Sequence, residues 1–196
     1  LSFLRCIPNL IIMAPSDESE CRAMLSTGYR HKGTAAIRYP RGAGPGAQID
    51  PSLDILPIGK GKELRVSSIT ARKKVAILAF GSMVGPSLTA ANMIDATLVN
   101  MRFIKPLDTA LIAEMASTHD LIVTVEENSL MGGAGSAVME TMQALHLSTP
   151  TMCLGLPDTF IEHGVHETML AQCGLDSEGI ANAIHVKLAA IHPNKS

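Results

Sequence analysis

The chain of 196 residues has few aromatic side chains, and this scarcity limits the ligands that it can bind. Phe, Tyr and Trp make up 3% of the residues, and Trp is absent. Single-stranded nucleic acid is usually bound by aromatic rings that stack on bases beside basic residues. The formal net charge of -2 also lacks the positive excess that is typical of DNA- and RNA-binding domains. The composition therefore predicts no nucleic-acid partner.

Long hydrophobic runs and paired cysteines are also missing. The longest apolar runs, residues 10–14 and 75–80, are far shorter than the roughly 18 residues of a membrane span. The first residues do not have the pattern of a signal peptide. No C-x-x-C pair or zinc-like spacing connects the four cysteines, which are Cys6, Cys21, Cys153 and Cys173. We therefore expect a cytoplasmic protein with reduced thiols and no membrane partner.

Apolar residues are plentiful at 46% and charged residues few at 17%, which favours a folded protein over a disordered one. Short apolar runs alternate with segments of helical spacing, which predicts parallel strands covered by helices on both faces. The expected strands are 9–14, 35–39, 75–80, 96–101, 121–125 and 151–154. The expected helices are 16–29, 86–94, 107–115, 133–145, 165–172 and 177–191, the first of them capped by Ser16. The fold class is therefore α/β.

Two arginines stand where the second expected strand ends, in the sequence Arg38-Tyr39-Pro40-Arg41-Gly42. Guanidinium groups bind phosphate through paired hydrogen bonds, and Pro40 would restrict the backbone between them. Ligands of α/β sheets also bind at the carboxyl ends of strands. The spacing therefore allows a phosphate clamp of Arg38 and Arg41, although two ordinary surface arginines would give the same pattern.

A glycine-rich turn at residues 132–135 follows the paired acids Glu126 and Glu127. Such a turn at a helix N-terminus can present backbone amides to an anion. The third glycine of a dinucleotide fingerprint and the Lys-Ser/Thr ending of a P-loop are both missing. Close packing is the other interpretation of these glycines. The two acids should point to opposite faces if the strand continues, so they do not form an acid and base pair.

Histidines and acids gather in Glu162-His163-Gly164-Val165-His166-Glu167. Zinc peptidases carry two histidines four residues apart on one helix face, whereas these two are three apart with a glycine between them. We therefore predict a turn followed by a helix and no metal site.

Several longer segments carry motifs of a known family, and they are residues 1–9, 13–18, 38–42, 56–61, 96–108, 123–128, 131–136, 155–158 and 160–164. These segments resemble the 1-deoxy-D-xylulose-5-phosphate synthases. The resemblance is collinear over nearly the whole chain, and some motifs are shared with transketolases and the beta subunits of 2-oxo acid dehydrogenases. The resemblance implies the end of a pyrimidine-binding α/β domain at 1–41, a linker at 42–74, and a transketolase C-terminal α/β domain with a mostly parallel sheet at 75–196.

Enzymes of this family condense pyruvate with D-glyceraldehyde 3-phosphate, losing carbon dioxide, in isoprenoid and thiamine biosynthesis. The resemblance implies a homodimer that uses thiamine pyrophosphate and Mg²⁺, and it assigns Arg41 to the phosphate group of the aldehyde, with Arg38 as a possible second contact. The family's catalytic, cofactor and metal residues would lie before Leu1, so we expect none here and an inactive, cofactor-free fragment. The chain also begins without Met, as a piece of a longer protein would. The alternative is a non-catalytic α/β module that binds a partner, related to the 2-oxo acid dehydrogenase beta subunits.

Overall fold

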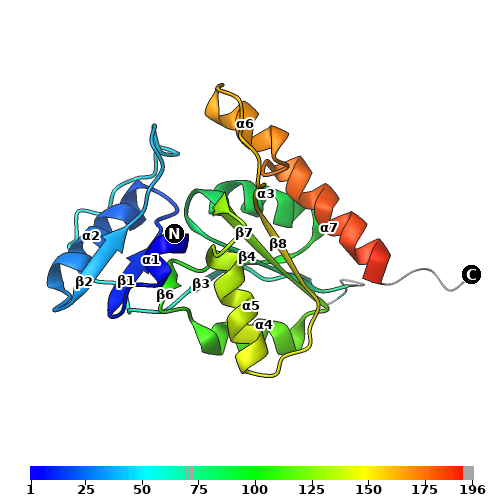
Figure 1. Ribbon diagram of the computed structural model, residues 1–196, viewed down its shortest axis with the longest axis horizontal. Helices are drawn as coiled ribbons and strands as arrows, with labels where there is room; N and C mark the ends of the chain where they lie inside the picture. The colour runs from blue at the N-terminus through cyan, green and yellow to red at the C-terminus, as the bar shows by residue number, and fades with distance from the viewer. Residues whose placement is uncertain (69, 71–72, 192–196) are drawn as a thin grey trace, which may run out of the picture.

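The computed structural model describes residues 1–68, 70 and 73–191. The chain folds into two adjacent sheets with helices around them (Figure 1). The strands are β1 (Leu10–Met13), β2 (Thr34–Ile37), β3 (Lys62–Arg65), β4 (Val75–Ala79), β5 (Thr97–Asn100), β6 (Phe103–Lys105), β7 (Leu121–Ser129) and β8 (Thr151–Leu156). The helices are α1 (Ser2–Arg5), α2 (Glu18–Arg30), η1 (Gly81–Met83), α3 (Val84–Ile94), α4 (Thr109–Thr118), α5 (Ala134–Ala144), α6 (His166–Gln172) and α7 (Ser177–Ile191). No helix among these described residues is long and apolar enough to cross a bilayer.

The larger sheet has the strand order β3-β5-β4-β7-β8, and only β3 runs antiparallel to its neighbour. Its central strand β4 is buried on both faces, since side chains alternate along a strand. Ala76 and Leu78 pack on one side, with α4 and α5, whereas Val75 and Ile77 pack on the other, with α3 and α7. This arrangement confirms the predicted α/β class with a mostly parallel sheet between helices.

The smaller sheet has the order β2-β1-β6 and pairs two strands near the N-terminus with one from the middle of the chain. Strand β6, which the sequence patterns did not predict, pairs antiparallel with β1. Leu10 and Ile12 of β1 belong to the same core as β4, while Ile11 and Met13 pack against Met24 of α2. The N-terminal unit, which consists of β1, α2 and β2, therefore shares its hydrophobic core with the larger sheet.

The segment expected to be a linker is partly ordered against its neighbours. Arg22 of α2 donates to the backbone oxygens of Pro51 and Ser52, at 3.0 and 3.2 Å, and Ser26 donates to that of Leu53 at 2.7 Å. Residues 62–65 form β3, an edge strand whose exposed side chains gave no apolar signal. Residues 69, 71 and 72 of that segment, and 192–196 of the expected C-terminal domain, lie outside the described residues.

Helix α2 is capped by Asp17, and the expectation that Ser16 would cap it is wrong. The carboxylate of Asp17 accepts the backbone N–H of Glu20 at 2.8 Å. The Ser16 hydroxyl instead donates to the Glu20 side chain at 2.9 Å. Both residue types suit a cap, and the register one residue later leaves the Glu20 carboxylate free to accept from Ser16.

Replacing Asp17 with alanine is expected to lower the free energy of unfolding by about 1 kcal/mol, the usual cost of losing an N-cap. Denaturant titration of the chain measures this change. The control is Asp158→Ala, because Asp158 is exposed and makes no side-chain hydrogen bond or ion pair within the described residues. Equal midpoints for the two variants would contradict the capping role.

Candidate functional site

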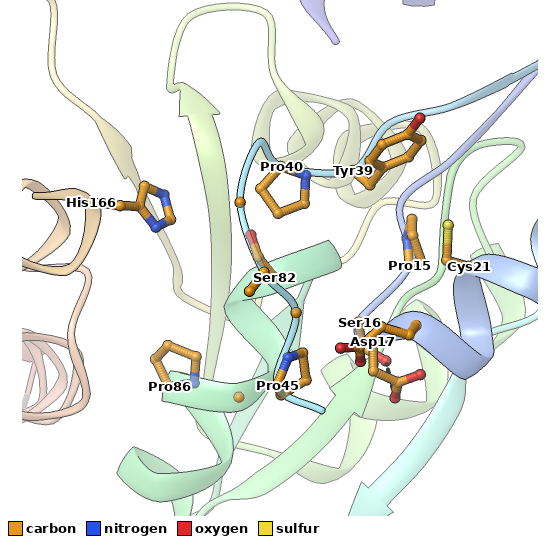
Figure 2. Close-up of a pocket in the computed structure, with 15 residues that line it drawn as sticks. Pro15, Ser16, Asp17, Cys21, Tyr39, Pro40, Pro45, Ser82, Pro86 and His166 are labelled. Atoms are coloured by element: carbon orange, nitrogen blue, oxygen red, sulfur yellow. Dashed lines mark hydrogen bonds between the residues drawn. The ribbon is translucent and has the colours of Figure 1, made fainter. Parts of the chain in front are cut away.

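A cavity of about 320 Å³ opens where the two sheets meet. Figure 2 shows His166 on one side of it and Cys21 on the other, with Pro40 and Ser82 between them. The loop after β2 supplies much of the wall, including Pro40 and Pro45. Pro15 and Pro86 line the cavity from other segments, and all four prolines stiffen the wall because each fixes its own φ angle. The residues lining the cavity are Pro15, Ser16, Asp17, Glu18, Cys21, Tyr39, Pro40, Gly42, Ala43, Gly44, Pro45, Ser82, Gly85, Pro86 and His166.

The Glu127 carboxylate, beside this cavity, forms hydrogen bonds with residues of η1 and α6. It accepts from the Ser82 hydroxyl in η1 at 2.6 Å and from Nε2 of His166 in α6 at 2.9 Å. Because an ionised carboxylate can only accept, Nε2 of His166 must carry the proton of this bond. Burial raises the pKa of Glu127, but the Ser82 and His166 hydrogen bonds and the Arg38 charge outweigh burial and hold the pKa below its ordinary value. The carboxylate is therefore ionised at neutral pH.

The two arginines of the expected clamp differ in their surroundings. Arg38 donates from Nη2 to the backbone oxygen of Glu127 at 2.7 Å, and its guanidinium lies 3.9 Å from the Glu127 carboxylate. Arg41 is exposed and has no side-chain hydrogen bond or ion pair with any described residue. Its neighbours Pro40 and Gly42 both line the cavity. Arg38 is thus engaged with the protein, whereas the guanidinium of Arg41 is available to a ligand.

The amides of the glycine-rich turn are already satisfied by a carboxylate of this chain. Glu126 is 1% exposed and accepts the backbone N–H groups of Ala134 and Gly135, both at 2.7 Å. A Cβ at position 133 would collide with that carboxylate. Desolvation raises the pKa of Glu126, and the two amide hydrogen bonds oppose the rise. These contacts favour packing, the second of the two interpretations of the turn.

The two neighbouring acids serve different sites, as the strand alternation predicts. Strand β7 continues through both, so Glu126 reaches the N-terminus of α5 and Glu127 reaches η1 and α6. The sequence patterns drew attention to Glu127 and His166 separately, the first in a pair of acids and the second in a cluster of histidines and acids, and assigned neither one a catalytic or metal-binding role. They did not predict the hydrogen bond between the two, nor that Ser82 joins it.

A second buried cluster holds the start of α2 near the cavity. Glu20 accepts from Nε of Arg102 at 2.7 Å and from the Asn100 amide at 2.9 Å. These two residues flank the end of β5, so the contacts join the N-terminal unit to the larger sheet. Because Ser16 and Asp17 precede Glu20 and line the cavity, the cluster fixes one wall of the cavity.

The acidic side chains around the cavity have partners within the described residues. No group of three His, Cys, Asp or Glu side chains among them is placed to hold a metal ion. The acids around the cavity are already engaged: Glu127 with Ser82 and His166, Glu20 with Arg102, and Glu18 with the amides of Gly46 and Ala47. All four cysteines are free, Cys6 is exposed, and none pairs with another.

Comparison with known proteins shows the family. The sequence matches the profile of the transketolase C-terminal domain over residues 65–180 and that of the transketolase pyrimidine-binding domain over residues 1–46. A solved structure described as "Split gene transketolase, inactive beta4 tetramer" superposes with a TM-score of 0.75 at 30% identity, covering 94% of this chain and 59% of that one.

Curated relatives are named 1-deoxy-D-xylulose-5-phosphate synthase. The protein from Methylobacillus flagellatus is 65% identical over 188 residues, and that from Ralstonia pickettii is 53% identical over 189, each covering 96% of this chain. The protein from Thioalkalivibrio sulfidiphilus is 54% identical over the whole chain. The chain spans about 30% of the length of each of these relatives. It therefore belongs to the transketolase family and is similar, within that family, to the 1-deoxy-D-xylulose-5-phosphate synthases.

Proposed function

We propose that this chain is part of a 1-deoxy-D-xylulose-5-phosphate synthase. The enzyme would condense pyruvate with D-glyceraldehyde 3-phosphate to 1-deoxy-D-xylulose 5-phosphate, with loss of carbon dioxide, for isoprenoid and thiamine biosynthesis. The observation that carries the proposal is the 65% identity to a protein of that name over 96% of this chain. Identity at this level over both matched domains supports a shared reaction.

The part played by this chain would be to hold the aldehyde substrate. Arg41 follows Pro40 on the cavity loop, and its guanidinium has no partner among the described residues. A phosphate group would give it paired, charge-assisted hydrogen bonds. The stiff, proline-lined wall beside it would restrict how the rest of the substrate lies.

Thiamine pyrophosphate supplies the carbanion chemistry in such enzymes when it is bound. We infer that its ligands, and those of Mg²⁺, come from residues outside this chain, because the acids near the cavity already have partners. The working enzyme would be a cytoplasmic homodimer without nucleic-acid or membrane partners, and this chain alone would be inactive.

The experiment compares the 196-residue chain with the complete enzyme from the same gene. Only the complete enzyme should release carbon dioxide from pyruvate in the presence of glyceraldehyde 3-phosphate and bind thiamine pyrophosphate in calorimetry. Release of carbon dioxide by the chain alone would contradict the assignment of the cofactor ligands. An inactive complete enzyme would contradict the proposed reaction.

A second candidate is a separate, non-catalytic subunit that needs a partner chain. The structural likeness to a protein described as a split gene transketolase favours it. The reading frame upstream of Leu1 separates the two candidates. A frame that continues for several hundred codons supports the first candidate, whereas a start codon at that point supports the second.

A further inference from the structure

The exposed Arg41 can serve as a ligand only if its backbone is held in place. Its own side chain is exposed and makes no hydrogen bond or ion pair with any described residue. The loop around it contains Gly42 and Gly46, both at positive φ with open space around the missing side chain. The fixed point nearest to Arg41 in the sequence is Arg38, three residues before it.

Arg38 is anchored twice. Its backbone N–H donates to the backbone oxygen of Met13 at 2.8 Å, which continues the pairing of β2 with β1. Its guanidinium donates to the backbone oxygen of Glu127 at 2.7 Å and faces the Glu127 carboxylate at 3.9 Å. The end of β7 therefore holds the start of the loop after β2, which carries Arg41 and lines the cavity.

The Glu127 carboxylate is held in turn by the cavity walls. Ser82 and His166 bind its two separate oxygens, and both of these residues line the cavity. Side chains of Glu127 and Arg38 are 13% and 32% exposed, so water screens their attraction only in part. The Glu127 carboxylate thus connects η1, α6 and Arg38, the residue at the start of the loop that carries Arg41.

We propose that Glu127, which Ser82 and His166 hold, is a positioning residue for Arg41: through Arg38 it sets where the Arg41 guanidinium meets the phosphate of the aldehyde substrate. The proposal rests on the proposed function, since it concerns the same substrate. It adds Glu127, which lies 86 positions from Arg41 in the sequence and does not contact the phosphate itself. Loss of the Glu127 charge should therefore weaken recognition of the phosphate and leave the reaction centre unchanged.

The test uses the complete enzyme with saturating pyruvate and two aldehydes, glyceraldehyde 3-phosphate and unphosphorylated D-glyceraldehyde. Glu127→Gln keeps the shape of the side chain and removes its charge. The KM for the phosphorylated aldehyde should rise about tenfold, in the range of couplings between residues of one network. The KM for D-glyceraldehyde and kcat should stay within about twofold.

A double-mutant cycle separates positioning from a general structural effect. When Arg41 is already alanine, Glu127→Gln should raise the KM for glyceraldehyde 3-phosphate by less than about twofold, because the group that it positions is gone. Glu162→Gln is the matched control, since Glu162 is exposed and has no side-chain partner within the described residues. It should leave both KM values unchanged.

His166→Ala is the second variant, because His166 is half exposed and its loss leaves the core intact. It should raise the KM for the phosphorylated aldehyde alone, by roughly threefold. Equal rises for both aldehydes, or the same effect of Glu127→Gln with and without Arg41, would overturn the positioning role. An inactive wild-type enzyme would instead refute the proposed function, so the two failures are distinguishable.

Discussion

Replacing Arg41 with alanine in the complete enzyme is expected to raise the KM for glyceraldehyde 3-phosphate by about 10- to 100-fold. Hydrogen bonds to charged groups contribute roughly 1.5–3 kcal/mol, which corresponds to this range. The KM for pyruvate should stay within about twofold, because pyruvate carries no phosphate for this residue to bind. Steady-state rates of carbon dioxide release, with each substrate varied in turn, measure both constants.

Two further substitutions sharpen the Arg41 result. Arg41→Lys keeps the charge but loses the paired geometry, so its KM should lie between those of the wild type and Arg41→Ala. Arg30→Ala is the control, because Arg30 is exposed and has no side-chain hydrogen bond or ion pair within the described residues. Comparable rises in KM for pyruvate and for the aldehyde would exclude a phosphate-binding role for Arg41.

Replacing Glu126 with alanine is expected to lower the free energy of unfolding by about 2–4 kcal/mol. The change would leave two buried amides, those of Ala134 and Gly135, without their acceptor, and each unsatisfied donor costs roughly 1–3 kcal/mol. Denaturant titration of the chain measures the loss. Glu114→Ala is the control, since Glu114 is exposed on α4 and its carboxylate has no hydrogen-bond partner within the described residues. A loss no larger than that of the control would contradict this role.

The Glu126 carboxyl group should also make the free energy of unfolding depend on pH. Desolvation raises the pKa of Glu126 in the folded chain above its ordinary value. The folded chain then keeps a proton that the unfolded chain has released, so this contribution to stability is complete below the ordinary pKa. It declines as the pH rises through the folded pKa. Glu126→Gln should flatten this decline, and an unchanged pH profile would contradict the raised pKa.

Buried regular elements were the predictable part of the fold. The runs that became β4, β5, β7 and β8 are apolar because helices cover both faces of the sheet, and the helices between them show their own spacing. Strands β3 and β6 were missed for two physical reasons. Strand β3 is an exposed edge that needs no apolar side chains, and β6 has three residues, too few to show a period.

The candidate site was predictable only in pieces. Arg41 stood out because its neighbours in the sequence form a recognisable motif, and its contact with a substrate phosphate stays a prediction. The Glu127 to His166 hydrogen bond joins residues 39 positions apart, and no local pattern encodes such a pairing. The predicted N-cap of α2 was wrong by one residue because Ser16 and Asp17 have similar capping tendencies. Only the position of Glu20 in the folded chain decides between them.

The contacts of strand β1 with the larger sheet affect how the chain unfolds. Its inner residues Leu10 and Ile12 share a core with β4, while β6 reaches back from the larger sheet to pair with it. Opening the smaller sheet would therefore expose apolar surface of the larger one, and the penalty would fall on both at once. For this reason we expect the two units to unfold together, in a single cooperative transition.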